Sequence, residues 1–188
     1  MHKEKTNMGD ICSASVQRGA GHYEGVEMHG HYHVVCHGAD GVLKWEDVIE
    51  NLVTTVGKNL TITGAVTNAA QGISYMGLKG AGTAVVADTQ ASHASWLEVG
   101  TTNLPTYTSP RKTPTWGTAS AGAISPTAAQ VFAMTGSGTV AGCFINVGGT
   151  SAIDNTTGTL FSAGDFTGGS KPVSNGDTLS VTYTATAA

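Results

Sequence analysis

Three histidines at alternate positions are the residues whose type and spacing could form a metal site. They are His29, His31 and His33. Side chains two residues apart on a β-strand share one face and follow one another at about 7 Å, and imidazole is a ligand for zinc, copper and nickel. A flat strand holds its side chains parallel, so we expect the polar outer face of a half-buried strand rather than a metal site. The alternative is that histidines from several subunits converge on a symmetry axis.

A serine and a histidine adjoin at Ser92 and His93, with Asp88 and Glu98 close by. Nucleophilic catalysis needs a nucleophile beside a base that a third group orients. Adjacent residues of a strand point to opposite faces, so this pair would not meet there. The motifs GxSxG, HExxH and GxxxxGK[ST] do not occur. We therefore expect no enzyme activity, no catalytic residue and no cofactor.

The three cysteines, Cys12, Cys36 and Cys143, have no CxxC spacing. Cys36 and Cys143 lie in the apolar runs HVVCH and AGCFI, so we expect both to be small core residues with free thiols. Cys12 lies in a polar N-terminal stretch, where an intermolecular disulfide is the alternative to a free thiol.

Small residues dominate the chain of 188 residues: Gly, Ala, Ser and Thr together number 90. Only 12% of residues are charged, the formal net charge is −4, and basic residues do not cluster. No apolar run is long enough for a membrane helix, and the start MHKEKTNMGD has no apolar stretch typical of a secretory signal. We expect neither membrane nor nucleic acid as a partner.

The chain divides into an N-terminal arm, residues 1–28, and one domain, residues 29–188. Four glycines interrupt the arm, and its apolar residues are isolated. Such a segment buries too little apolar area to offset the cost of ordering, about 1–2 kcal/mol per residue. We expect a flexible arm that orders on a neighbouring molecule, and a plain flexible tail is the alternative.

The domain opens with a predicted β-hairpin over residues 29–56. His31, His33, Val35 and His37 alternate with Tyr32, Val34 and Cys36, which is the period of a strand. Asp40 and Gly41 provide a turn. The second segment, residues 42–55, also fits helical spacing, but the turn and its Val/Thr-rich end favour a strand.

Short β-segments separated by glycine-rich turns make up the rest of the domain. In the last of them, Leu179, Val181 and Tyr183 face one way and threonines face the other. Short strands at about ten-residue spacing predict an all-β, antiparallel β-sandwich or jelly-roll-like domain. The predicted strands are Leu60–Val66, Ser74–Leu78, Ser95–Val99, Gln130–Met134, Thr139–Val147, Thr159–Ala163 and Thr178–Thr186.

Two tryptophans flank a polar stretch, at Trp96 and Trp116. Scarce large aromatic residues in a small-residue sandwich usually fill the core, and we expect that role for both. Stacking on a carbohydrate is the functional alternative.

Several segments read together resemble a family of structural proteins from tailed bacteriophages. The first is HYHVVCHGADGVLKWEDVIENLVTTVGKN, similar to the family pattern YHVxCxDxDGxxKWxDxxxNLVTxxGxN. DTQASHASWLEV, Tyr107, RKTPTW (Arg111 to Trp116) and SGTVAGCFI follow. The last is GTLFSAGDFTGGSKPVSNGDTLSVTYT. Together these segments span His31 to Thr184.

The resemblance implies a non-enzymatic virion component with an all-β fold. Within that class we expect a capsid decoration (cement) protein, made in the host bacterial cytoplasm and bound to the outer surface of the capsid. Its partners would be the major capsid protein and copies of itself, as a dimer or trimer. The turn GADGVLK departs from the family pattern, and residues 1–28 have no counterpart in it, so no role is inherited there. The alternative function is a tail- or fibre-associated module that binds host glycans.

Overall fold

The computed structural model describes residues 26–188, which form strands and one helix. The helix is α1 (Thr55–Thr67). The strands are β1 (Met28–His37), β2 (Leu43–Val53), β3 (Ser74–Lys79), β4 (Glu98–Val99), β5 (Ala123–Ile124), β6 (Gln130–Ala133), β7 (Gly138–Val140), β8 (Gly142–Val147), β9 (Thr159–Asp165), β10 (Lys171–Val173) and β11 (Thr178–Ala187).

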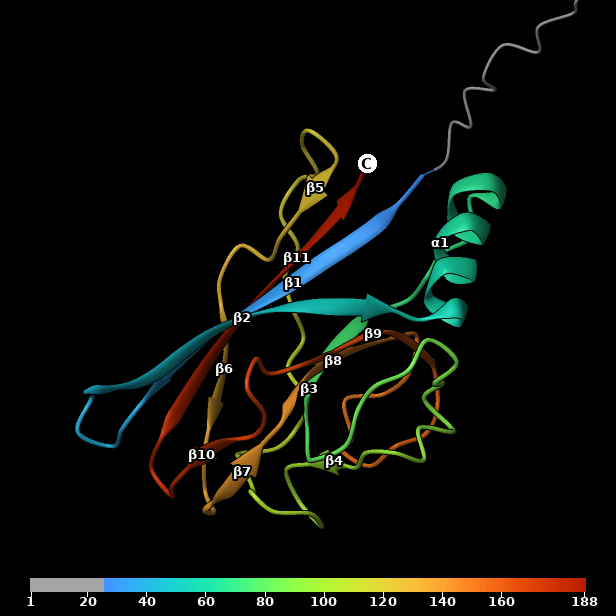
Figure 1. Cartoon of the computed structure of the whole chain (residues 1–188). Coiled ribbons are helices and arrows are strands. Elements are labelled where there is room, and N and C mark those ends of the chain that lie inside the picture. The colour runs from blue at the N-terminus through green and yellow to red at the C-terminus, as the bar shows by residue number, and fades with distance from the viewer. Residues whose placement is uncertain (1–25) are drawn as a thin grey trace, which may run out of the picture.

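The strands form two antiparallel sheets that share β2 (Figure 1). In sheet A, β1 lies between β2 and β11, and β11 also pairs with the short β5 and β6. In sheet B the order is β4-β3-β8-β9, and β9 pairs with the last residues of β2, Asn51–Val53. β2 therefore leaves β1 after Glu50 and crosses from one sheet to the other. Strands β7 and β10 form a separate two-stranded ribbon.

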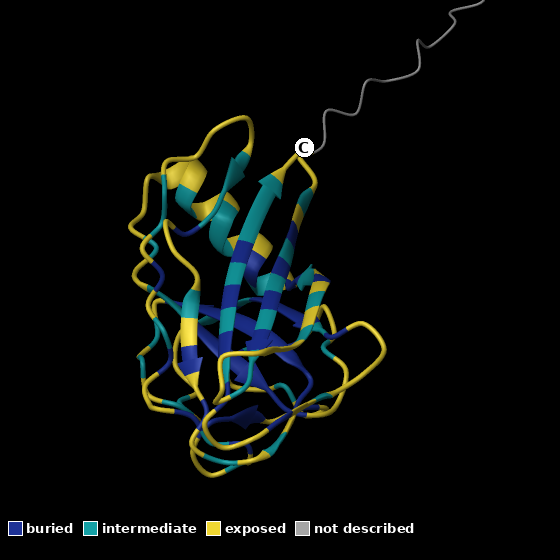
Figure 2. Cartoon of the chain, turned by 90° about the vertical axis from the view of Figure 1, so that its left-hand side faces the viewer, coloured by how far each residue is buried: buried dark blue, intermediate teal, exposed yellow. Residues whose placement is uncertain are grey.

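The main core lies between the inner faces of the two sheets, as the buried colours of Figure 2 show. Sheet A contributes the alternating residues of β1 and β11, and sheet B contributes those of β3 and β8. This arrangement confirms the predicted all-β, sandwich-like class, while the jelly-roll topology stays a prediction. The central residues of the main core are Tyr32, Val34, Cys36, Met76, Leu78, Cys143, Ile145, Leu179, Val181 and Tyr183.

Every residue of β8 is buried, because loops cover the face of sheet B that points away from the main core. A second apolar cluster forms there from Trp96, Phe144, Leu160 and Ala163. The segments that cover this face contain little regular structure, so side-chain contacts have to fix them.

Most predicted strands are present. The hairpin prediction is confirmed, with β1 beginning at Met28, one residue before the predicted domain start, and β2 ending at Val53. The helical alternative for residues 42–55 is wrong. The predicted strand Thr139–Val147 is divided at Ala141 into β7 and β8, and only Glu98–Val99 of Ser95–Val99 is a strand. The predicted arm, residues 1–28, and Cys12 within it lie outside the described residues except for positions 26–28.

The predicted strand Leu60–Val66 is wrong, because these residues belong to α1. The helix sequence TVGKNLTITGAVT is rich in β-branched residues and contains two glycines, all poor helix formers. Packing overrides this preference: a Cβ added to Gly57 would lie 2.3 Å from the carbonyl oxygen of Phe161. Glycine therefore allows the first turn of the helix to lie directly against β9.

Thr54 connects the end of β2 to the start of α1. Its hydroxyl oxygen accepts a hydrogen bond from the backbone N–H of Gly57 (3.0 Å), as an N-cap residue does. The same hydroxyl donates to the carbonyl oxygen of Leu160 in β9 (2.5 Å). One fully buried side chain thus caps the helix and ties it to sheet B.

We expect Thr54→Ala to lower the free energy of unfolding by about 1–2 kcal/mol, because it removes the cap and leaves buried backbone groups without a partner. Thr54→Ser keeps the hydroxyl and should lose clearly less. Urea denaturation followed by circular dichroism measures both. Equal losses for the two variants would show that the methyl group, and not the hydroxyl, matters.

Candidate functional site

The histidine row lies on the outer face of β1, as predicted. The residues that alternate with these histidines along β1, Tyr32 and Val34, point into the core. Ring nitrogens of His29 and His33 each contact a carboxylate, at 3.1 Å from Glu27 and 2.5 Å from Glu46. In the described part of the chain, no group of three or more His, Cys, Asp or Glu side chains is arranged to hold a metal ion.

The segment around Ser92 and His93 fixes a buried indole. The ring of His93 stacks on Trp96 with centroids 3.9 Å apart, and the side-chain carboxylate of Asp88 accepts the indole N–H at 2.9 Å. Ser92 instead pairs its backbone with Thr89. Asp88 therefore binds the indole N–H and His93 stacks on the indole ring, so both side chains contact Trp96 rather than each other. Together they hold the indole in place. Trp96 is only 2% exposed, so the core role predicted for it is confirmed.

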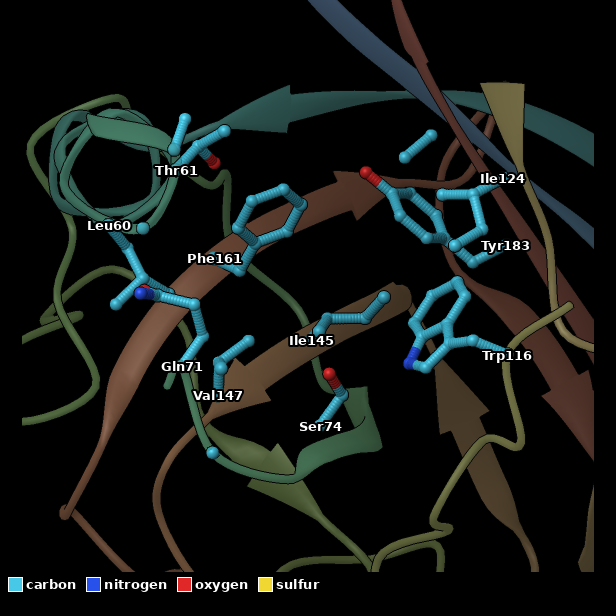
Figure 3. A pocket seen from close by; sticks show the side chains of 14 residues that line it. Leu60, Thr61, Gln71, Ser74, Trp116, Ile124, Ile145, Val147, Phe161 and Tyr183 are labelled. Atoms are coloured by element: carbon cyan, nitrogen blue, oxygen red, sulfur yellow. The ribbon is translucent and has the colours of Figure 1, made fainter. Parts of the chain in front are cut away.

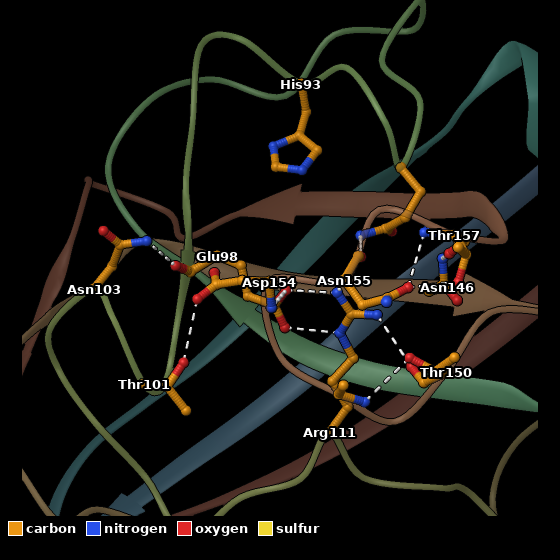
Figure 4. Close-up of polar contacts among 12 residues, drawn as sticks. His93, Glu98, Thr101, Asn103, Arg111, Asn146, Thr150, Asp154, Asn155 and Thr157 are labelled. Carbon is orange, nitrogen blue, oxygen red and sulfur yellow. Dashed lines mark hydrogen bonds and ion pairs between the residues drawn. The ribbon is translucent and has the colours of Figure 1, made fainter.

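A buried ion pair joins Arg111 to Glu98 beneath these loops (Figure 4). The guanidinium donates to both carboxylate oxygens, with Nε 2.8 Å from Oε1 and Nη2 2.6 Å from Oε2. The side chains are 0% and 3% exposed. The guanidinium also lies 5.4 Å from the centre of the Phe144 ring on the second apolar cluster. Bidentate pairing of this kind is geometrically specific.

The remaining hydrogen-bonding groups of this pair bind the loop at residues 150–155. Arg111 Nη1 donates to the carbonyl oxygen of Thr150 (3.2 Å), and Nη2 to that of Asn155 (2.9 Å). The backbone N–H of Asp154 donates to Glu98 Oε2 (2.8 Å). Separately, the side chain of Asn103 donates to the backbone carbonyl oxygen of Glu98 (2.9 Å). The ion pair therefore joins segments that lie far apart in the sequence.

A second ion pair, Lys79 with Asp165, fixes the neighbouring loop. Lys79 is fully buried at the end of β3, and its ammonium group also donates to the carbonyl oxygen of Gly82 (2.6 Å). The Asp165 carboxylate accepts the backbone N–H of Ala84 (3.1 Å). We did not predict this pair from the sequence, since a lysine at the end of an apolar strand normally lies in solvent. Glu98 and Arg111 belong to motifs that the sequence analysis identified, but nothing in the spacing of these two residues indicated that they pair.

Burial sets the protonation behaviour of the groups in this interior. Burial raises the pKa of Glu98, and the Arg111 guanidinium opposes that rise. Burial raises the pKa of the Cys36 thiol to about 11, and it raises the pKa of Cys143 further. Both cysteines are fully buried with free thiols, which confirms the predicted core role.

An apolar cavity of about 500 Å³ opens between the sheets where β1 and β2 diverge (Figure 3). Trp116 lies at its edge, half-buried, with its ring 6.3 Å from that of Tyr183. Ser74 and Gln71 are among the few polar side chains in its wall. The lining residues are Leu60, Thr61, Gly64, Ala65, Gln71, Gly72, Ser74, Trp116, Ile124, Ile145, Val147, Phe161, Tyr183 and Ala185.

A second hollow, of about 580 Å³, lies on the other side of α1, between the helix and the start of β1. We call it the β1–α1 hollow. The two depressions share Thr61 and Ala65, so α1 has an open apolar surface on both flanks. The residues that line the β1–α1 hollow are Val26, Glu27, Met28, His29, Lys58, Thr61, Ile62 and Ala65.

Comparisons of the chain with protein-family models, with curated proteins and with solved structures gave no match. Within residues 26–188, no helix is long and apolar enough to cross a membrane. The motifs of the sequence and the geometry described above are therefore the basis for a functional proposal.

We expect Arg111→Met to lower the free energy of unfolding at pH 7.5 by about 3–5 kcal/mol, because it leaves the Glu98 carboxylate buried without a counter-charge. The loss should be smaller at pH 5. Without the guanidinium, the pKa of Glu98 in the folded chain rises further above its unfolded value of about 4.3, so stability falls as pH rises between the two values. Urea titrations at both pH values measure the difference.

The matched control is the double variant Arg111→Met/Glu98→Gln, which has no carboxyl group at position 98. Its stability should lack the additional pH dependence of the single variant. An equal loss at pH 5 and pH 7.5 in Arg111→Met would contradict the proposed role of the buried carboxylate.

Proposed function

We propose that this chain is a structural protein of tailed-bacteriophage virions and that it decorates the outer surface of the capsid. The observation that carries the proposal is where the family-like motifs lie. Asp88, Trp96 and Glu98 of DTQASHASWLEV and Arg111 of RKTPTW meet in one buried framework. Motif residues that hold loops in place, rather than line a reactive cleft, support a structural role.

The proposed partners are the major capsid protein and copies of the chain itself, as a dimer or trimer. The protein would be made in the host bacterial cytoplasm and act on the capsid surface without a cofactor. Attachment to a protein surface needs exposed apolar contact area inside a polar rim. Exposed apolar side chains outside α1 offer such area, for example Leu97 and Leu104, which are 61% and 66% exposed. Many identical weak contacts on a capsid would give firm attachment.

The alternative, a tail- or fibre-associated module that binds host glycans, would now depend on Trp116. Trp96 is buried under His93 and cannot stack on a sugar. Trp116 borders the apolar cavity, but that cavity has few polar groups to hold sugar hydroxyls. The geometry therefore favours the capsid role.

We expect the purified full-length chain to bind heads assembled without it, with saturation at hundreds of copies per head. Co-sedimentation followed by quantitative mass spectrometry measures the occupancy. Heads that already carry their full complement are the matched control and should take up none. Deleting residues 1–25 should leave a folded domain with reduced occupancy, since the arm is proposed to order on a neighbour.

Two results would count against the capsid role. One is the absence of co-sedimentation, and the other is a virion content of a dozen copies or fewer, which is typical of a tail tip or collar. Saturable quenching of tryptophan fluorescence by host oligosaccharides, lost in Trp116→Ala, would instead support the glycan-binding alternative.

A further inference from the structure

Helix α1 has a surface that is unusual for a solvent-exposed helix. Its thirteen residues include one charged side chain, Lys58, and only Gly57 is buried. Surface helices normally present a charged or polar face to water. Here Ile62 and Val66 are largely exposed instead. These exposed apolar side chains lie next to the β1–α1 hollow, which makes this surface a candidate docking site.

The β1 side of the hollow offers an open strand edge. The backbones of Glu27 and Ala188 exchange two hydrogen bonds, of 2.8 and 3.0 Å. Backbone groups of successive residues along an antiparallel strand point to alternate sides, so those of Met28 point away from β11. The first pair between β1 and β2 is His31 with Glu50. Among residues 26–188, Met28 therefore has no strand partner on that side, where an extended segment could pair.

We propose that residues 11–16 of the chain dock in the β1–α1 hollow as an extended segment. The described chain begins at Val26, which itself lines the hollow. Nine residues lie between Val16 and Val26, and the ten residue steps span at most about 36 Å. The segment is therefore tethered at the site that it would fill.

The composition of this stretch fits the hollow. Its sequence, ICSASV, has no charge and no glycine, and Cys12, Ala14 and Val16 alternate with serines. Residues 1–10 and 17–25 both carry charges. An extended strand of this pattern presents one small apolar face, which suits the wall formed by Ile62 and Ala65. The inference rests on the hollow and the sequence, and it holds whether or not the chain binds a capsid.

Disulfide trapping tests the docking with a native thiol. Ile62→Cys places a thiol in the hollow, while Cys12 supplies the second one from the segment. Cys36 and Cys143 are fully buried and do not compete. Under mild oxidation of the full-length chain, we expect a Cys12 link to position 62 to form at least tenfold faster than in the control, Leu43→Cys. Peptide mass spectrometry identifies the link.

Leu43 is a matched control position because it is similarly exposed, 52% against 61%, and pairs with His37 at the far end of β1. Equal rates at positions 43 and 62 would overturn the proposal, because they would mean that the segment only collides with the surface. Adding Cys12→Ser should abolish the link. A mixture of isotope-labelled and unlabelled chains shows whether the segment comes from the same or a neighbouring copy, and either result supports docking.

Amide hydrogen exchange provides a readout without introduced thiols. The variant Ile11→Asp/Val16→Asp places charges in the docking stretch and leaves the described domain unaltered. We expect the amides of α1 to exchange several-fold faster in this variant than in the native chain. Unchanged exchange in α1 would show that the helix is covered by something else or not at all, and it would overturn the proposal. Saturable binding to capsid heads is measured separately, so each proposal can fail alone.

Discussion

The ion pair between Glu98 and Arg111 is the constraint on which the loop-covered half of the domain depends. Removing a carboxylate and a guanidinium from water is tolerable only if every remaining donor and acceptor finds a partner. Those partners are backbone groups of the loop at residues 150–155. These contacts hold in place a region that has little regular structure of its own. The second apolar cluster then packs beneath it.

The domain separates this polar framework from its apolar contact surface. Ion pairs and the Trp96 hydrogen bond fix the outer face of sheet B, while the opposite end of the sandwich, around α1, is open and almost uncharged. The ion-pair framework and the apolar surface of α1 are thus built from different residues. Substitutions on the exposed surface of α1 should therefore leave the framework that holds the loops undisturbed.

Local patterns predicted the strands but not the features that depend on contacts across the sequence. Alternation along β1 and β11 identified both strands, because one face of each lies in the core. It could not identify α1, whose residues favour strands and become helical through the Thr54 cap and the fit of Gly57 on β9. It also could not show β2 changing sheets, since the alternation continues through the crossing. The pairing of Lys79 with Asp165 spans 86 residues, and no local spacing encodes it.

The strand that belongs to both sheets makes the domain one cooperative unit. β2 bonds with β1 over most of its length and with β9 at its end, and Thr54 then begins the helix. Loss of the hairpin would therefore remove an edge from sheet B and the anchor of α1 in the same event. Separation of β2 from either sheet therefore disturbs the other sheet as well. The domain should consequently resist partial opening, in which one layer is exposed to proteases or to aggregation while the other persists.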